Sequence, residues 1–158
     1  MNTAAKKQWL IDTAEAAKNG GHTWPDYAAC EAALESNYGQ SLLATADNNL
    51  FGTKQHMHPI YGTHNLPTKE FLDPDGSGPQ PAAWVVVNAA WVKYPNISAC
   101  FDDRMSTLAR LRRAYPHYDA ALHSPDPVVF IREVSKSWST DPARADKVLA
   151  IHTEFFGI

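Results

Sequence analysis

The spacing of apolar side chains at the start of the chain predicts an amphipathic helix over Thr3–Lys18. Apolar residues recur there at intervals of three and four, and Asn19-Gly20-Gly21 ends the pattern because glycine readily adopts a left-handed cap. A second helix is predicted over Trp24–Ser36, with Thr23 as its N-cap and Pro25 in its first turn. The chain therefore opens with two helices joined by a short turn.

The amino-acid composition changes between residues 48 and 92, where Gly, Pro, His, Asn and Thr are frequent. Residues that favour strands gather in Thr68–Leu72 and Trp84–Val92, separated by a turn-rich loop at 73–81, which predicts a small hairpin or sheet. Helical patterns then return in three segments: Ser98–Ala114, Asp126–Lys136 and Asp141–Phe155. The predicted fold is an α+β domain, a helical body with a small β lobe.

Composition narrows the class of protein. The chain has 158 residues, 44% hydrophobic and 20% charged, which predicts one folded domain over residues 1–158 and a monomer. Its longest apolar run, Ala82–Val87, is far too short for a membrane span, so no stable membrane insertion is expected. A net charge of −3 argues against nucleic acid as a partner. Arginine is confined to the second half, where it either docks an anionic polymer or solvates helices.

Glu35 is the first candidate for chemistry because it lies at the predicted C-terminus of the second helix. That end of a helix carries a partial negative charge and disfavours an ionised carboxylate. The neighbouring Leu34 and Tyr38 would desolvate the carboxyl, and both effects favour the protonated form that a general acid needs. The same pattern also fits a solvent-facing Glu that ends a helix. Glu31, one turn earlier, is either a like-charge neighbour or a surface residue.

Two segments resemble metal-binding patterns, but neither predicts a metal site. His56, His58 and His64 are spaced so that they could bind zinc, but no nearby Glu or Cys completes the set, which favours ordinary loop histidines. The segment that begins at Asp73 imitates a calcium loop, yet its twelfth position, which needs an acid, is Trp84. We therefore expect no metal and no organic cofactor.

The two cysteines, Cys30 and Cys100, are too few for a disulfide framework. They are either buried thiols or a single bridge. Cys30 lies on an alanine-rich helix face, which favours a buried thiol over a catalytic nucleophile.

Several motifs occur in a fixed order along the chain. They are Ala33-Leu34-Glu35-Ser36-Asn37-Tyr38-Gly39-Gln40-Ser41, Asn48-Asn49-Leu50-Phe51-Gly52-Thr53-Lys54, Leu66-Pro67-Thr68-Lys69-Glu70-Phe71, Phe101-Asp102-Asp103, Tyr115-Pro116-His117-Tyr118 and Trp138-Ser139-Thr140-Asp141-Pro142. Together they resemble the glucosaminidase family of peptidoglycan hydrolases (glycoside hydrolase family 73, with a mannosyl-glycoprotein endo-β-N-acetylglucosaminidase-like domain) over residues 5–155. The resemblance implies a lysozyme-like fold that cleaves the β-1,4 bond after N-acetylglucosamine in peptidoglycan glycan strands.

The resemblance also implies roles for two carboxylates. The family's general acid maps onto Glu35, and its second carboxylate maps onto Glu70. On a strand, Glu70 would face opposite to its neighbours and look into the cleft, although a surface Glu paired with Lys69 fits equally well. Asp73 and Asp75 are the reserve candidates, and the acetamido group of the substrate is an alternative nucleophile.

Aromatic and amide side chains near the motifs are candidates for sugar binding, since sugars need flat apolar faces with polar groups beside them. The candidates are Tyr38, Asn49, Tyr118 and Trp138, whereas Phe51 is expected in the core. Trp138 departs from the tyrosine that the family usually has and lacks its hydroxyl. Either Tyr118 fills that role, or position 138 only stacks on sugar.

Other functions on the same fold stay open: a muramidase, a lytic transglycosylase that uses Glu35 alone and leaves a 1,6-anhydro end, or a non-catalytic wall-binding module. The first twenty residues show no signal-peptide pattern, which predicts synthesis in the cytoplasm. A wall-degrading enzyme made there suggests a phage or prophage endolysin released by a separate pore, or a fragment of a larger protein. The genes that surround this one test that hypothesis.

Overall fold

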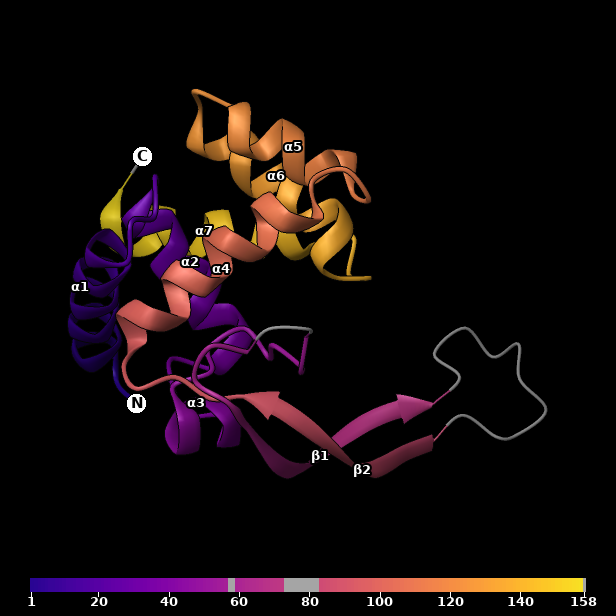
Figure 1. Cartoon of the computed structure of the whole chain (residues 1–158). Helices are drawn as coiled ribbons and strands as arrows, with labels where there is room; N and C mark the ends of the chain where they lie inside the picture. Colours follow the sequence, from indigo (N-terminus) through magenta and orange to yellow (C-terminus); the bar gives the residue numbers. More distant parts are fainter. Residues whose placement is uncertain (57–58, 73–82, 158) are drawn as a thin grey trace.

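The computed structural model describes residues 1–56, 59–72 and 83–157, with the backbone alone at 68–72, 83–85 and 87. Within these residues it contains seven helices and one two-stranded sheet (Figure 1). The elements in chain order are α1 (Thr3–Asn19), α2 (Pro25–Ser36), α3 (Leu42–Asp47), β1 (Thr63–Leu72), β2 (Ala83–Val92), α4 (Ile97–Leu111), α5 (Pro116–His123), α6 (Pro127–Trp138) and α7 (Arg144–Phe156). The predicted helical body with a small β lobe is confirmed.

Helix α2 lies at the centre of the helical body. Two clusters of buried side chains form the core, and α2 contributes Ala29 and Ala33 to one and Ala28 and Ala32 to the other. A helix that is buried on nearly every side needs small residues so that its neighbours can approach closely. Helix α2 therefore packs on more than one side, against both clusters of the core.

The two strands form an antiparallel hairpin that extends away from the helices (Figure 1). Its register runs from the pair Thr63 and Val92 to the pair Leu72 and Ala83. Its base is joined to the body, because Val92 is 1% exposed and its backbone N–H donates to the carbonyl of Thr53. Buried contacts of Val92 thus fix the hairpin at its base.

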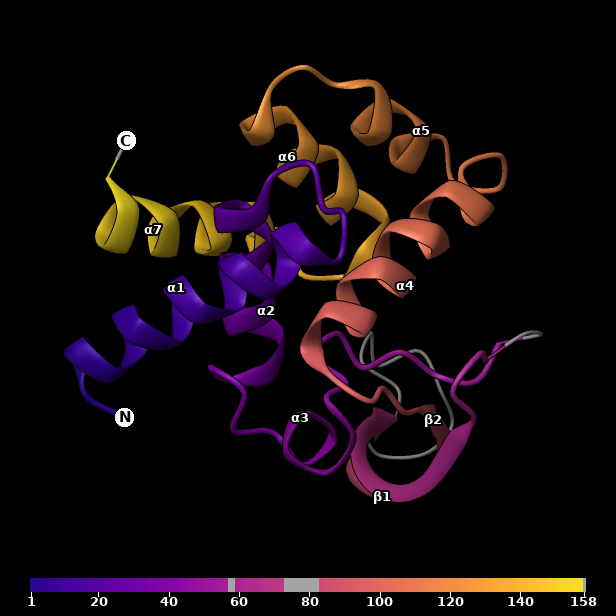
Figure 2. The same ribbon diagram turned by 60° about the vertical axis from the view of Figure 1, so that its left-hand side comes forward.

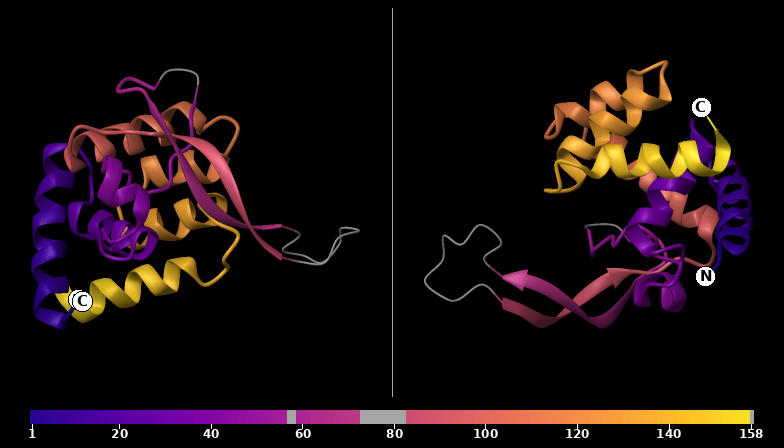
Figure 3. Two further views of the ribbon diagram at one scale, coloured as in Figure 1. Left: turned by 90° about the horizontal axis from the view of Figure 1, so that it is seen from below. Right: turned by 180° about the vertical axis from the view of Figure 1, so that it is seen from behind.

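The other helices surround α2 and place the hairpin at one end of the body. Helices α5 and α6 lie side by side at the far end of α4, whereas the hairpin leads into its start (Figure 2). Helix α7 passes along α2, and α1 packs against α2 and α4 (Figure 3). No helix among the described residues is long and apolar enough to cross a membrane.

Several local predictions differ from the structure. Thr23 does not cap α2: the N-cap is Trp24, which makes no side-chain cap hydrogen bond, although Pro25 is in the first turn as expected. The short helices α3 and α5 were not predicted. Strand β1 begins five residues earlier than its β-forming run, at Thr63, and includes Pro67. A proline is tolerated there because each strand of a two-stranded sheet is an edge strand.

Candidate active site

The turn that follows Glu35 has an unusual backbone. Three successive residues, Asn37, Tyr38 and Gly39, have positive φ values of 50°, 55° and 73°. The side chain of Ser36 holds this turn, since its hydroxyl donates to the carbonyl of Ala32 at 2.6 Å and accepts from the N–H of Gly39 at 2.9 Å. Helix α2 therefore ends abruptly one residue after Glu35.

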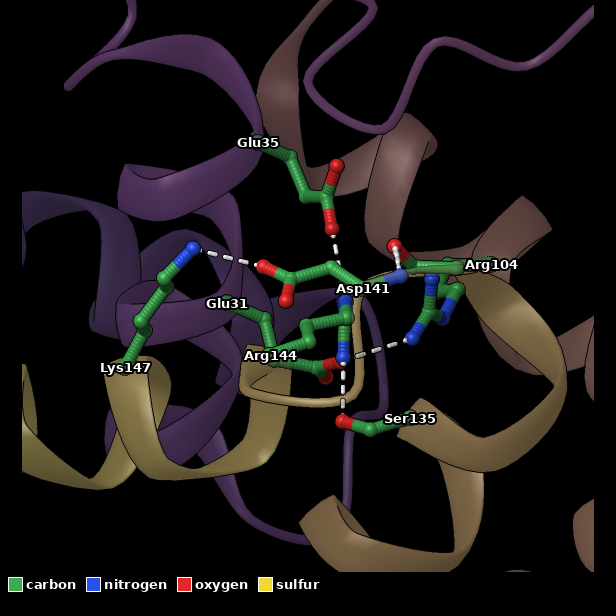
Figure 4. Close-up of polar contacts among 8 residues, drawn as sticks. Glu31, Glu35, Arg104, Ser135, Asp141, Arg144 and Lys147 are labelled. Carbon is green, nitrogen blue, oxygen red and sulfur yellow. Dashed lines mark hydrogen bonds and ion pairs between the residues drawn. The ribbon is translucent and has the colours of Figure 1, made fainter. Parts of the chain in front are cut away.

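Glu35 presents a partly exposed carboxyl at this helix end. Its side chain is 25% exposed, and its Oε1 accepts a hydrogen bond from Arg144 Nε at 2.7 Å (Figure 4). The other oxygen, Oε2, makes no hydrogen bond to any residue that the structure describes. One carboxyl oxygen is thus held by the protein, and the other is available to a ligand.

Glu31 is neither a surface residue nor a simple like-charge neighbour, so both interpretations of its sequence position were incomplete. It is 0% exposed, and its Oε2 accepts from Arg104 Nη2 at 2.9 Å and from Arg144 Nη2 at 2.8 Å. Burial disfavours the charge on Glu31, but the two guanidiniums outweigh burial and hold its pKa below the usual value. Arg144 also donates from Nη1 to the hydroxyl of Ser135 at 2.8 Å. We call these four charged side chains (Glu31, Glu35, Arg104 and Arg144) the buried charge network.

Sequence reasoning missed both arginines of this network. Arg104 and Arg144 are 3% and 1% exposed, so they neither solvate a helix face nor dock an external polymer. Burial disfavours the charge on Arg144, but Glu31 and Glu35 together outweigh burial and raise its pKa. No local motif marks either residue, because each pairing joins helices that are far apart in sequence.

Trp138 and Tyr118 lie close together beside the network. The guanidinium of Arg104 lies 3.6 Å from the ring centroid of Trp138, and the rings of Tyr118 and Trp138 are 6.2 Å apart. Phe51, whose ring centroid lies 6.1 Å from that of Trp138, is 5% exposed and belongs to the core, as predicted. Trp138 is half-buried, so part of the indole faces outward.

A hollow of about 770 Å³ opens next to these residues. It is formed by the end of α6 and the segment that leads into α7, and its lining includes Trp138 and Asp141. Ser135 belongs both to this lining and to the contacts of Arg144, so the hollow adjoins the buried charge network. Glu35 and Tyr118 are not among the described residues that line it, so the hollow lies beside the carboxyl of Glu35 and does not enclose it.

Two predicted sugar-binding residues lie elsewhere. The ring of Tyr38 packs against Trp9 and Phe155, near the C-terminal end of α7, whereas Glu35 contacts the N-terminal end of that helix. Asn49 is 1% exposed, and its amide bonds the backbone of Thr53 and Val92 at 2.9 Å. Asn49 therefore connects the base of the hairpin to the preceding loop.

The predicted second carboxylate is on the hairpin. The backbone of Glu70 is on β1, paired with Val85 of β2. Asp73 and Asp75, the reserve candidates, lie outside the described residues. The side chain of Glu70 is outside the part of the chain whose side chains the structure describes.

The histidines at the base of the hairpin face different carboxylates. His64 Nδ1 lies 2.7 Å from Asp47 Oδ2, and His56 Nε2 lies 3.6 Å from Asp103 Oδ2. His58 lies outside the described residues. The three histidines of the spaced pattern are therefore not seen to share one site.

Both cysteines are buried thiols, one of the two predicted outcomes. Burial raises the pKa of each thiol to about 12. A thiol that stays protonated at neutral pH is a poor nucleophile. Cys30 therefore contributes packing within α2.

Comparisons with known proteins identify a matching family and similar folds. A family model described as glucosaminidase, mannosyl-glycoprotein endo-beta-N-acetylglucosaminidase, matches residues 11–155. The catalytic domain of the autolysin Auto from Listeria monocytogenes has a similar structure, with a TM-score of 0.73, 21% identity, and coverage of 99% of this chain and 87% of that one.

Two further solved structures share the fold. The glycoside hydrolase domain of FlgJ from Salmonella typhimurium gives a TM-score of 0.70 at 19% identity, covering 97% of this chain and 99% of that one. A peptidoglycan hydrolase mutant from Sphingomonas sp. A1 gives 0.64 at 21% identity, covering 92% and 91%. No curated protein sequence matches the chain. Because the family model spans nearly the whole sequence, the chain belongs to the glucosaminidase family of glycoside hydrolases.

Proposed function

We propose that this protein hydrolyses the β-1,4 bond after N-acetylglucosamine in peptidoglycan, with Glu35 as the general acid. The family supports the bond type, and the similar structure from Sphingomonas sp. A1 is that of a peptidoglycan hydrolase mutant. The observation that carries the proposal is the carboxyl of Glu35: Arg144 holds Oε1 at 2.7 Å, while Oε2 makes no hydrogen bond to any described residue. A general acid needs one oxygen within reach of the leaving group.

In the proposed reaction, Glu35 donates its proton from Oε2 to the glycosidic oxygen as the bond from that oxygen to the anomeric carbon breaks. A water molecule adds to the anomeric carbon, and a second carboxylate accepts its proton. We assign that role to Glu70, whose strand leads out from the body. Trp138, which lines the hollow, is proposed to stack on a sugar ring. The ring of Tyr118 lies next to the indole of Trp138.

The test is digestion of purified peptidoglycan by the wild type and by Glu35→Gln, followed by borohydride reduction and mass spectrometry. We expect reduced N-acetylglucosamine ends with the wild type and at least a roughly 100-fold slower reaction with Glu35→Gln, because general acid catalysis contributes about 10²–10⁴-fold. Glu154→Gln, an exposed carboxylate on α7, is the matched control and should retain full activity.

Each other product identifies a different function. Reduced muramic acid ends would show a muramidase, and 1,6-anhydro ends would show a lytic transglycosylase. Binding to cell walls without cleavage would show a non-catalytic module, and full activity of Glu35→Gln would overturn the assignment of the acid. Delivery as an endolysin stays a prediction.

Glu70→Gln separates the mechanisms further. If Glu70 is the base, we expect a loss of roughly 10²-fold or more in kcat. If the acetamido group of the substrate is the nucleophile, Glu70→Gln should retain most activity, and a substrate without that group should react poorly.

A further inference from the structure

Helix α2 carries two glutamates one turn apart in opposite surroundings. The side chain of Glu35 is 25% exposed at the helix end, whereas Glu31 is fully buried between α4 and α7. A buried carboxylate is costly unless charged partners compensate it. The position of Glu31 therefore calls for a role that a surface Glu would not have.

A single oxygen of Glu31 joins two arginines from different helices. Arg104 on α4 and Arg144 on α7 both donate to Oε2, at 2.9 and 2.8 Å (Figure 4). Burial lowers the pKa of Arg104 and is opposed by Glu31, and an arginine keeps its charge in proteins even so. The buried charge network thus holds two positive and two negative groups when Glu35 is ionised.

Each arginine also contacts a residue of the candidate active site. Arg144 Nε donates to Glu35 Oε1 at 2.7 Å, and Arg104 stacks on the indole of Trp138 at 3.6 Å. Glu31 touches neither residue directly. Among the described residues, the carboxylate of Glu31 joins the two arginines that make these contacts.

We propose that Glu31 is a positioning residue that orients both the acid Glu35 and the indole of Trp138 through the two buried arginines. The inference rests on the proposed function, in which Glu35 is the acid. With Oε1 accepting from Arg144, the proton of the acid is held on Oε2, the oxygen that is open to substrate. Glu31 fixes this arrangement because it holds the guanidinium of Arg144 from the other side.

Glu31 also balances charge around Glu35. Arg144 on α7 donates to Glu35 and Arg104 on α4 interacts with its charge, while Glu31 is one turn away on the same helix; Ser135 on α6 bonds Arg144 rather than Glu35. Asp141, in the segment before α7, and its partner Lys147 on α7 lie nearby (Figure 4), and Tyr118 on α5 interacts with Arg104 and Glu31. Without the charge of Glu31, two guanidiniums would face Glu35 alone and favour its ionised form.

The test is Glu31→Gln, which keeps the shape of the side chain and removes its charge. We expect kcat to fall by about 100-fold, because a displaced acid costs about that much, and KM for a soluble glycan fragment to rise, because the indole of Trp138 is displaced as well. We also expect the alkaline limb of the pH–rate profile to move to lower pH by about one unit, since Glu35 must be protonated to act. Glu133→Gln on α6, an ion-paired glutamate at the surface, is the matched control and should change none of these quantities.

A second variant keeps the proposal falsifiable if Glu31→Gln does not fold. Glu31→Asp retains the charge but is one methylene shorter, so we expect the wild-type pH profile with a kcat reduced by about 10-fold or more. Reduced thermal stability with an unchanged pH profile and kcat in the folded variant would overturn the positioning role. If Glu35→Gln is inactive while both Glu31 variants behave like the wild type, only this inference fails. If Glu35→Gln is active, the proposed function fails first.

Discussion

The helical body and the β hairpin hold their side chains in contrasting ways. In the body, Glu35 is fixed by a buried arginine that itself donates to Glu31 and Ser135, on two different helices. The hairpin is held by its own ladder and by contacts at its base, and Val86 on β2 is 66% exposed. The proposed acid is therefore in a region where buried side chains from several helices meet, whereas the proposed second carboxylate is on a two-stranded hairpin.

This contrast suits an enzyme that acts on a polymer. A general acid must be placed to within a fraction of an ångström, which a densely packed core provides. A group that only activates water or stabilises charge works over a wider range of distances.

Arg144→Met should cause the largest loss of stability. It leaves Glu31 buried with one of its two guanidinium partners, and breaking a buried ion pair costs about 3–5 kcal/mol. Arg132→Met is the control, because Arg132 pairs with Asp146 at the surface and should change stability by less than about 0.5 kcal/mol. Urea unfolding followed by circular dichroism measures both. Equal losses of unfolding free energy in the two variants would mean that the buried ion pairs of Arg144 stabilise the body no more than the surface pair of Arg132.

His22 should make the body sensitive to acid. The ring is 5% exposed, and burial lowers its pKa from 6.5 to about 4. His22 therefore becomes protonated below pH 6.5 in the unfolded chain but only below about pH 4 in the folded chain. Stability should fall by about 3 kcal/mol over that interval as the pH decreases.

His22→Asn isolates this effect. Asn retains an acceptor for the N–H of Trp24, which donates to His22 Nδ1 at 3.1 Å, but does not titrate. The free energy of unfolding of the variant should depend less on pH between 6.5 and 4. Parallel curves for the two proteins would contradict the prediction.

Two valines on one strand compare the base of the hairpin with its outer part. Val92→Ala at the buried base should cost about 2 kcal/mol, because it removes methyl groups from the core. Val86→Ala at the exposed position should cost less than about 0.5 kcal/mol. Thermal unfolding of both variants checks the difference. Similar losses would show that the outer hairpin is as well supported as its base.

Two glycines with positive φ test the turn after Glu35. An added Cβ at Gly39 would lie 2.7 Å from Trp9 Nε1, whereas at Gly52 nothing lies within 4 Å. Both alanine variants carry the cost of a left-handed backbone, about 1 kcal/mol. Gly39→Ala should cost about 1 kcal/mol more, because Trp9 must move. An excess cost at Gly52 instead would contradict this account of the turn.

The end of α2 and the place of Glu35 could be predicted because the signals are local. Asn37-Tyr38-Gly39 is typical of a helix end in the sequence, and in the structure all three residues have positive φ. Phe51 was likewise predicted in the core from its apolar character alone. The local sequence was thus sufficient to predict where one helix ends and whether one side chain is buried.

The buried charge network could not be predicted in the same way. Glu31 and Arg144 are 113 residues apart, and a charged side chain is normally expected at the surface. Two short helices were also missed, although Ser41 caps α3 and Pro116 begins α5, because so few residues show no clear period. Side-chain pairings across helices depend on tertiary packing that no window along the chain contains.

The network also links catalysis to the order in which the chain is made. Because α7 supplies Arg144, Glu35 gains its hydrogen-bond partner only after this late helix has been synthesised and has docked on α2. A nascent or partly folded chain lacks the oriented acid even though the motif around Glu35 is complete. Under the proposed function, activity therefore requires that α7 has docked on α2.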